Sequence, residues 1–343
     1  MDLSLQRGFN RRRLTQFLAA VGLVFLSLGV VPADTPAWPT VSELQTLLRS
    51  QLPSVPEASP GETNAGAYLK SLAPWVLVGE ERPSRGGVLS RTNVYGDGIA
   101  YLRVNEVQIG LSEAIASALA NLGGTSRIHG VILDLRFTGG ADFREAAAAA
   151  GVLTAREPSG FRMGTTEIEG RSVPTSFPLP TIILVNRQTR GAAEALAAAT
   201  RHLIAPSLVI GTNTSGQARS YRPVPVPGGA VIRVAGDPFT LPSGTSIPPT
   251  GLEPDLQVAV SEEDEAIYFT DEFRRVFQGK PVTAEPSFRL NEAELVRRRR
   301  GPRSTGDRAS GTPARVVHDP VLARGVDLLE SLAARGDDAG NSR

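Results

Sequence analysis

The residue types that could carry out chemistry are unevenly represented in this 343-residue chain. There is no cysteine, which excludes disulfides, thiolate catalysis and cysteine-ligated metal centres. Two of the 36 basic residues are lysines, Lys70 and Lys280, so a catalytic lysine has two candidates. The three histidines are far apart in the sequence, which argues against a histidine-rich metal site: His129, His202 and His318. Serine and threonine remain as nucleophiles, and neither a cofactor nor a metal is expected.

Four segments carry the functional signal when they are read together. The first, D-L-R-F-T-G-G at 134–140, directly follows a predicted buried strand. The second begins with L-V-N at 184–186 and continues as T-R-G-A-A-E at 189–194, at the start of a predicted helix. The third and fourth are V-I-G-T-N-T-S-G-Q at 209–217 and G-L-E-P-D at 251–255. Each is weak alone, and their ordered combination is more specific.

In order and spacing, these segments resemble the catalytic core of the tail-specific protease (C-terminal processing peptidase) family of serine peptidases. The resemblance covers roughly residues 97–260. It implies an α/β fold with a ClpP/crotonase-like core of repeated β-β-α units. It also implies a Ser/Lys dyad, in which a desolvated lysine takes the proton of a serine that attacks the peptide carbonyl. Many family members carry a PDZ domain before this core, but the 45 residues between Leu52 and Gly98 are too few for one.

Both dyad positions implied by the resemblance carry the wrong residue. Gly191 stands at the nucleophile position and Gln217 at the lysine position. Glycine has no nucleophile, and glutamine cannot act as a general base near neutral pH. Lys70 and Lys280 lie outside the core region, so neither is expected to substitute. The sequence therefore predicts no conventional catalytic residue.

Some site residues of the family pattern nevertheless remain. Ser215 and Thr189 are the nearest hydroxyls and His202 the nearest titratable base, so a rebuilt Ser215/His202 or Thr189/His202 pair is the fallback. The resemblance implies an oxyanion or peptide-binding turn at Gly139, Gly140 and Ala192. With no nucleophile, a purely structural role for the two glycines, as a tight turn, is favoured.

Alternating strand and helix patterns predict parallel crossover units in the middle of the chain. Short helices are expected at 41–52, with Ser42 as N-cap, and at 65–72. Buried strands are expected at 130–135 and 181–186, and Ala-rich helices at 143–153 and 192–201. An acidic helix is expected within 261–277, and an apolar stripe predicts a terminal helix with Leu322, Val326, Leu329 and Leu332 on one face.

The predicted division is a signal peptide at 1–33, a helical lead-in at 34–97, the core at 98–280, a linker with a basic run at 281–318 and a C-terminal helix at 319–335.

The N-terminal segment fits a secretory signal peptide. Three arginines at 11–13 precede an apolar run, and Val31-Pro32-Ala33 offers a cleavage point. An uncleaved membrane anchor is the alternative. Four arginines and one aspartate lie in 1–33, so the remaining chain carries 32 basic and 34 acidic residues, which gives no general argument for nucleic acid as a partner. We expect export to the periplasm or cell envelope.

The leading hypothesis is an exported, catalytically inactive relative of the tail-specific proteases, a pseudoprotease that binds an extended peptide or a protein segment. The alternatives are an active serine-type peptidase with a relocated site, a crotonase-type acyl-transfer or hydrolase enzyme, and a purely structural envelope protein. Neither the partner nor the oligomeric state follows from the sequence.

Overall fold

The computed structural model describes most of the chain between Trp38 and Gly340. The predicted signal segment 1–33 and most of the predicted linker 281–318 lie outside the described residues. The described ranges are 38–52, 61–79, 86–154, 156, 158–170, 175–277, 280–281 and 316–340. No helix within these ranges is both long and apolar enough to span a membrane.

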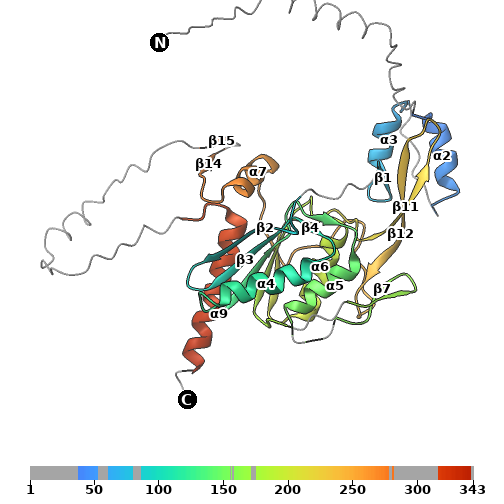
Figure 1. The fold of residues 1–343 in the computed structure, drawn as a ribbon. Coiled ribbons are helices and arrows are strands. Elements are labelled where there is room, and N and C mark those ends of the chain that lie inside the picture. The colour runs from blue at the N-terminus through green and yellow to red at the C-terminus, as the bar shows by residue number, and fades with distance from the viewer. Residues whose placement is uncertain are drawn as a thin grey trace, which may run out of the picture.

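A six-stranded sheet forms the centre of the fold (Figure 1). All neighbouring pairs are parallel except the antiparallel pair at one edge. In spatial order the strands are β13 (Leu256–Gln257), β10 (Ser207–Gly211), β9 (Thr181–Val185), β5 (Gly130–Asp134), β3 (Ile99–Val104) and β2 (Leu89–Tyr95). Every residue of β5 and β9 is buried, as expected for apolar strands that are covered on both faces. The predicted α/β fold class is confirmed.

Helices cover both faces of this sheet. Its larger core packs against α4 (Leu111–Gly123), α5 (Phe143–Val152) and α6 (Ala192–Leu203). The alanines of α5 and α6 are buried, which lets the two helices pack closely together. The opposite face carries α9 (Pro320–Gly340), and Leu322 and Leu329 of this helix are buried against the strands.

The predicted C-terminal stripe is only partly buried. Leu332 remains 37% exposed, so the apolar contact ends one turn earlier than the pattern indicates. Helix and sheet approach closely at Gly325, where an added Cβ would lie 3.4 Å from side-chain atoms of Ile132 and Ile182.

A second, five-stranded sheet builds a lobe beside the core (Figure 1). Its long strand β12 (Val231–Thr240) pairs with β1 (Val76–Val78) and β11 (Arg219–Pro225), and nearer the core with the hairpin β7 (Phe161–Met163) and β8 (Thr166–Ile168). Helices α2 (Val41–Arg49) and α3 (Ala65–Ser71) complete a small separate core with this sheet. The lead-in therefore folds onto strands that come from the middle of the chain.

Several local expectations are corrected by the structure. The N-cap of α2 is Thr40 and not Ser42, because the Thr40 hydroxyl accepts from the Glu43 N–H while the Glu43 carboxylate accepts from the Thr40 N–H. The acidic helix α7 (Glu262–Thr270) lies within the expected segment 261–277. Strand β2 precedes residue 97 yet pairs with β3, so this hairpin crosses the predicted boundary between lead-in and core. The remaining short strands are β4 (Glu106–Val107), β6 (Gly139–Gly140), β14 (Val276–Phe277) and β15 (Lys280–Pro281).

Candidate functional site

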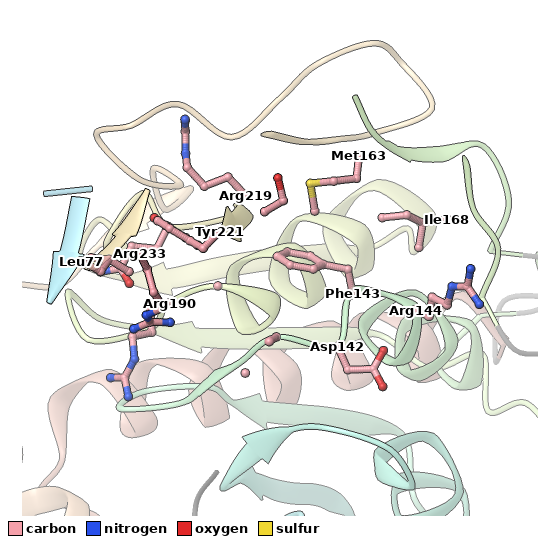
Figure 2. Close-up of a pocket in the computed structure, with 15 residues that line it drawn as sticks. Leu77, Asp142, Phe143, Arg144, Met163, Ile168, Arg190, Arg219, Tyr221 and Arg233 are labelled. Carbon is pink, nitrogen blue, oxygen red and sulfur yellow. The ribbon is translucent and has the colours of Figure 1, made fainter. Parts of the chain in front are cut away.

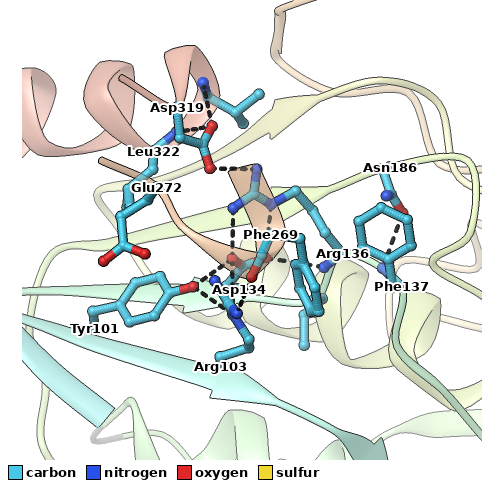
Figure 3. Close-up of polar contacts among 12 residues, drawn as sticks. Tyr101, Arg103, Asp134, Arg136, Phe137, Asn186, Phe269, Glu272, Asp319 and Leu322 are labelled. Atoms are coloured by element: carbon cyan, nitrogen blue, oxygen red, sulfur yellow. Dashed lines mark hydrogen bonds and ion pairs between the residues drawn. The ribbon is translucent and has the colours of Figure 1, made fainter. Parts of the chain in front are cut away.

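The D-L-R segment at the end of β5 forms a buried ion cluster, which we define as Tyr101, Arg103, Asp134, Arg136 and Asp319 (Figure 3). The Arg136 guanidinium donates from Nε and Nη2 to the two carboxylate oxygens of Asp134, at 3.0 and 2.8 Å. Its Nη1 lies 2.8 Å from a carboxylate oxygen of Asp319, at the start of α9. The segment thus holds the C-terminal helix against the sheet.

The remaining members of the cluster complete the coordination of Asp134. The Tyr101 hydroxyl donates to its carboxylate at 2.7 Å, and Arg103 Nε donates to that hydroxyl at 2.8 Å. Burial alone would raise the pKa of Asp134, but the charge and hydrogen bonds of Arg136 outweigh it and lower this pKa. Asp134 is therefore held as a carboxylate, with a structural role.

The Gly139–Gly140 turn follows this cluster and pairs with β4. Just before it, Phe137 has φ +61°, which its ring contact with Phe269 (centroids 4.7 Å apart) and a hydrogen bond from its N–H to Asn186 Oδ1 (3.1 Å) help to hold. Gly140 has φ +141°, and a Cβ there would overlap the Val107 carbonyl. Only glycine fits this position, which supports the structural role considered from the sequence.

Gly191, at the implied nucleophile position, is the N-cap of α6 with φ +62° and ψ −126°. A Cβ at this position would overlap the carbonyl oxygen of Gly140. The Arg190 side chain lies over the same turn, since its Nε would be 3.1 Å from a Cβ on Gly139. A serine side chain could therefore enter only if the Gly140 peptide moved, and the predicted oxyanion turn directs a carbonyl oxygen toward residue 191.

The Glu194 carboxylate brings the two implied dyad positions together. Its Oε2 accepts from the Gly191 N–H at 3.0 Å and from the Gln217 N–H at 2.7 Å. Its Oε1 accepts from the Gly216 N–H at 2.7 Å and from the Thr214 hydroxyl at 2.5 Å. Burial raises the pKa of Glu194 despite these donors. The two positions implied by the resemblance therefore lie beside one carboxylate, which they contact through backbone N–H groups.

The fallback catalytic residues are not brought together as a pair with a base. The buried Thr189 hydroxyl donates to the Leu135 carbonyl at 2.8 Å and accepts from the Asn186 N–H at 3.0 Å. The Ser215 hydroxyl donates to Glu194 at 3.3 Å. His202 is exposed in the last turn of α6, whereas Gly191 caps its first turn, and this helix is about 18 Å long at 1.5 Å per residue. Ala192, the first residue of α6, is fully buried.

A cavity of about 470 Å³ opens over Gly191 and Gln217 (Figure 2). It lies between the start of α5, the start of α6 and the lobe strands β1, β11 and β12. Its charged lining residues are one aspartate, Asp142, and four arginines: Arg144, Arg190, Arg219 and Arg233. We call these residues and the cavity the arginine cleft. The described residues contain no group of carboxylates and histidines suited to a metal ion.

The arginines of the cleft were missed at the level of sequence. They come from four separate segments of the chain, and arginine is common throughout the sequence, so no local pattern distinguishes them. Arg190 could have been noticed because it directly precedes the implied nucleophile position. Arg219 follows Gln217 by two residues, which offered a second signal.

The cleft lies in an α/β protein, over the two dyad positions that the resemblance implies. A sequence model of peptidase family S41 matches residues 98–258, so the resemblance inferred from the four segments is confirmed at the family level. The chain is 27% identical over 167 residues to a chloroplastic C-terminal processing peptidase of Tetradesmus obliquus. That alignment covers 47% of this chain and 35% of the relative, so the chain spans about a third of the relative's length.

Solved structures with a similar fold include a photosystem II D1 C-terminal processing protease, with 24% identity, a TM-score of 0.39 and coverage of 47% of this chain and 42% of that one. Another is an S41 protease described as putative from Bacteroides fragilis, with 17% identity, a TM-score of 0.44 and coverage of 63% and 59%.

Proposed function

We propose that this protein is an exported pseudoprotease that uses the old substrate cleft to bind an extended peptide or protein segment. The observation that carries the proposal is that residue 191 has no side chain and no space for one. The position implied for the nucleophile is a glycine, and the Gly140 carbonyl occupies the space of any side chain there. Gln217 at the second position offers an amide in place of a base. Export rests on the signal pattern in residues 1–33.

The cleft retains what peptide binding requires. Glu194 fixes the two loops that border it through four backbone and hydroxyl donors, so the walls are pre-formed. One wall consists of strands β1, β11 and β12, and strands are suited to recognise extended backbone. Pre-formed walls reduce the entropy cost of binding.

The test is the incubation of an unfolded casein substrate with the full chain and with a Gly191→Ser/Gln217→Lys double variant. We expect no cleavage by the wild-type protein. We also expect none by the double variant, because the Gly140 carbonyl and Arg190 still occupy the site. Cleavage by the wild-type protein that a single hydroxyl substitution abolishes would refute the proposal.

An active serine peptidase with a relocated site is the second candidate. One contact favours it, the hydrogen bond from Ser215 to a carboxylate whose pKa is raised. Labelling of the folded protein by a hydroxyl-directed fluorophosphonate, lost in Ser215→Ala, would support it. We expect no labelling, because the oxygen of Glu194 that faces Ser215 already accepts two backbone N–H groups.

A further inference from the structure

We propose that the arginine cleft recognises a carboxylate of the bound segment, and that Arg190 and Arg219 are the residues that contact it. The inference rests on the proposed peptide binding and adds the chemical class of the peptide, which is acidic.

The first observation is an unusual buried cation. Arg219 is 5% exposed, and its guanidinium stacks on the Trp75 ring at 4.4 Å from the centroid. Its Nε is buried without a hydrogen-bond partner among the described residues. A buried guanidinium N–H normally has an acceptor, because the unmet donor costs free energy. A carboxylate that enters the cleft can supply the missing acceptor.

The second observation is the placement of Arg190. Its side chain is exposed and lies over the Gly139–Gly140 turn, beside Gly191. No carboxylate lies within ion-pair distance of Arg190 among the described residues. Its charge therefore remains available at the point where the implied chemistry would have occurred, and a guanidinium fork matches a carboxylate in geometry.

The surroundings strengthen the positive field. In Figure 2, Arg190 and Arg233 lie on one side of the cavity and Arg144 on the other. Arg233 lies in the wall of the cavity and donates to the Gly79 carbonyl. The first turns of α5 and α6 border the cavity, although Asp142 and Glu194 already cap their N–H groups. A single lining aspartate against four arginines leaves the cleft positive, in a chain whose overall charge is +1.

The stacked Trp75 gives the site a specific geometry. Trp75 is 40% exposed, and the Arg219 guanidinium lies over its ring, which restricts the positions that the guanidinium can take. A fixed guanidinium loses little rotational freedom when it binds, which favours a directed contact over a diffuse charge effect. The structure thus separates two contributions: a positioned donor at Arg219 and an exposed charge at Arg190.

The experiment measures fluorescence anisotropy of the full chain with a labelled peptide of alternating glutamate and alanine. Matched peptides carry glutamine for glutamate, and each sequence is made with a free and an amidated C-terminus. We expect the glutamate peptide to bind at least about tenfold more tightly than the glutamine peptide, since hydrogen bonds to charged groups contribute this much or more. Equal binding of the two peptides with free C-termini that is lost when either is amidated would assign the site to a terminal carboxylate, and would refute the acidic class of the peptide.

Three variants assign the recognition to the cleft. Arg190→Gln should reduce the preference for the glutamate peptide about fivefold to tenfold, and Arg219→Gln should do the same if the protein remains folded by circular dichroism. Arg127→Gln, at an exposed position in the loop between α4 and β5, should leave the preference unchanged.

The results distinguish failure of carboxylate recognition from failure of the peptide binding on which it rests. Equal binding of all four peptides, unaffected by Arg190→Gln, would refute carboxylate recognition while leaving peptide binding intact. Absence of binding by any peptide would refute both. A preference that Arg127→Gln reduces as much as Arg190→Gln would refute the assignment to the cleft.

Discussion

The buried ion cluster and the arginine cleft both contain arginines close to the end of β5. They differ in whether these arginines have carboxylate partners within the protein. In the cluster, Arg136 is fully buried and contacts two carboxylates, Asp134 and Asp319. In the cleft, Arg190 and Arg219 have no carboxylate within ion-pair distance among the described residues. Internal pairing identifies the cluster as part of the framework. The lack of internal carboxylate partners at Arg190 and Arg219 is the basis of the proposal that the cleft binds a ligand.

The four segments also differ in whether their contacts are made by side chains or by the backbone. In D-L-R at 134–136, the Arg136 side chain pairs with Asp319 at the start of α9, which is a structural task. At the positions that the resemblance implies for the nucleophile and the lysine, Gly191 and Gln217 contribute backbone N–H groups to Glu194. Their side chains could change without loss of that contact.

The largest expected effect is on stability, from Arg136→Ala. This change leaves the buried Asp319 carboxylate without its cation and Asp134 with only the more distant Arg103, which costs about 3–5 kcal/mol. Urea unfolding should show a clear loss in the free energy of unfolding. Arg190→Ala, the matched change in the cleft, should stay within about 0.5 kcal/mol of wild type. Equal effects of the two variants would contradict the division between framework and cleft.

Glu194→Gln tests the framework beneath the cleft. The amide replaces one acceptor oxygen with a donor, which opposes N–H groups at Gly191, Gly216 or Gln217. We expect a loss of about 1–3 kcal/mol in urea unfolding, together with weaker peptide binding. Glu253→Gln, at an exposed position, serves as the control and should change neither. Loss of stability with unchanged peptide binding would show that the loops do not depend on Glu194 for their binding geometry.

Gly191→Ser has a smaller expected cost. The positive φ and the contact with the Gly140 carbonyl both oppose a side chain, so we expect about 1–3 kcal/mol of destabilisation. Gly229→Ser is a matched control, because Gly229 also has a positive φ (+83°) but has open space around its Cβ position. Thermal unfolding of both variants measures how much more stability is lost at residue 191 than at residue 229, and this difference reports the contact with the Gly140 carbonyl. Equal losses would mean that the Gly140 peptide group moves easily to make room for the serine side chain.

The two regions should also differ in the sign of their pH dependence. The folded-state pKa of Asp134 is lowered, so its contribution is present above the ordinary aspartate pKa of about 3.9 and is lost as the pH falls further. The pKa of Glu194 is raised, so its protonation favours the folded state and that contribution is lost as the pH rises through the raised pKa.

Urea unfolding between pH 7 and pH 3 can detect this difference. Asp134→Asn should reduce the loss of stability at acid pH relative to wild type, whereas Glu194→Gln should increase it. Parallel pH profiles for wild type and both variants would contradict the assignment of charges in the two regions.

Much of the fold was accessible from sequence because it depends on local apolar patterns. The fully buried strands β5 and β9 and the Ala-rich helices α5 and α6 were predicted close to their observed bounds. Strands β1, β7 and β8 were missed because they are three residues long and pair with distant β12. No period of two can be recognised in so few residues.

The candidate site likewise has one part that could be predicted from the sequence and another that could not. The two implied dyad positions could be placed by their spacing, and the structure brings them to one carboxylate oxygen of Glu194. The ion pair between Arg136 and Asp319 spans 183 residues and could not be read from any local pattern. The arginine cleft was likewise invisible, because tertiary structure alone gathers Arg144, Arg190, Arg219 and Arg233.

The central claim is that the cleft binds a peptide without cleaving it. The most direct measurement is mass spectrometry of the glutamate peptide recovered from the wild-type complex after prolonged incubation at saturation. The account predicts that the peptide binds and is recovered intact. Cleavage products that disappear with Ser215→Ala would contradict it and establish a relocated serine site.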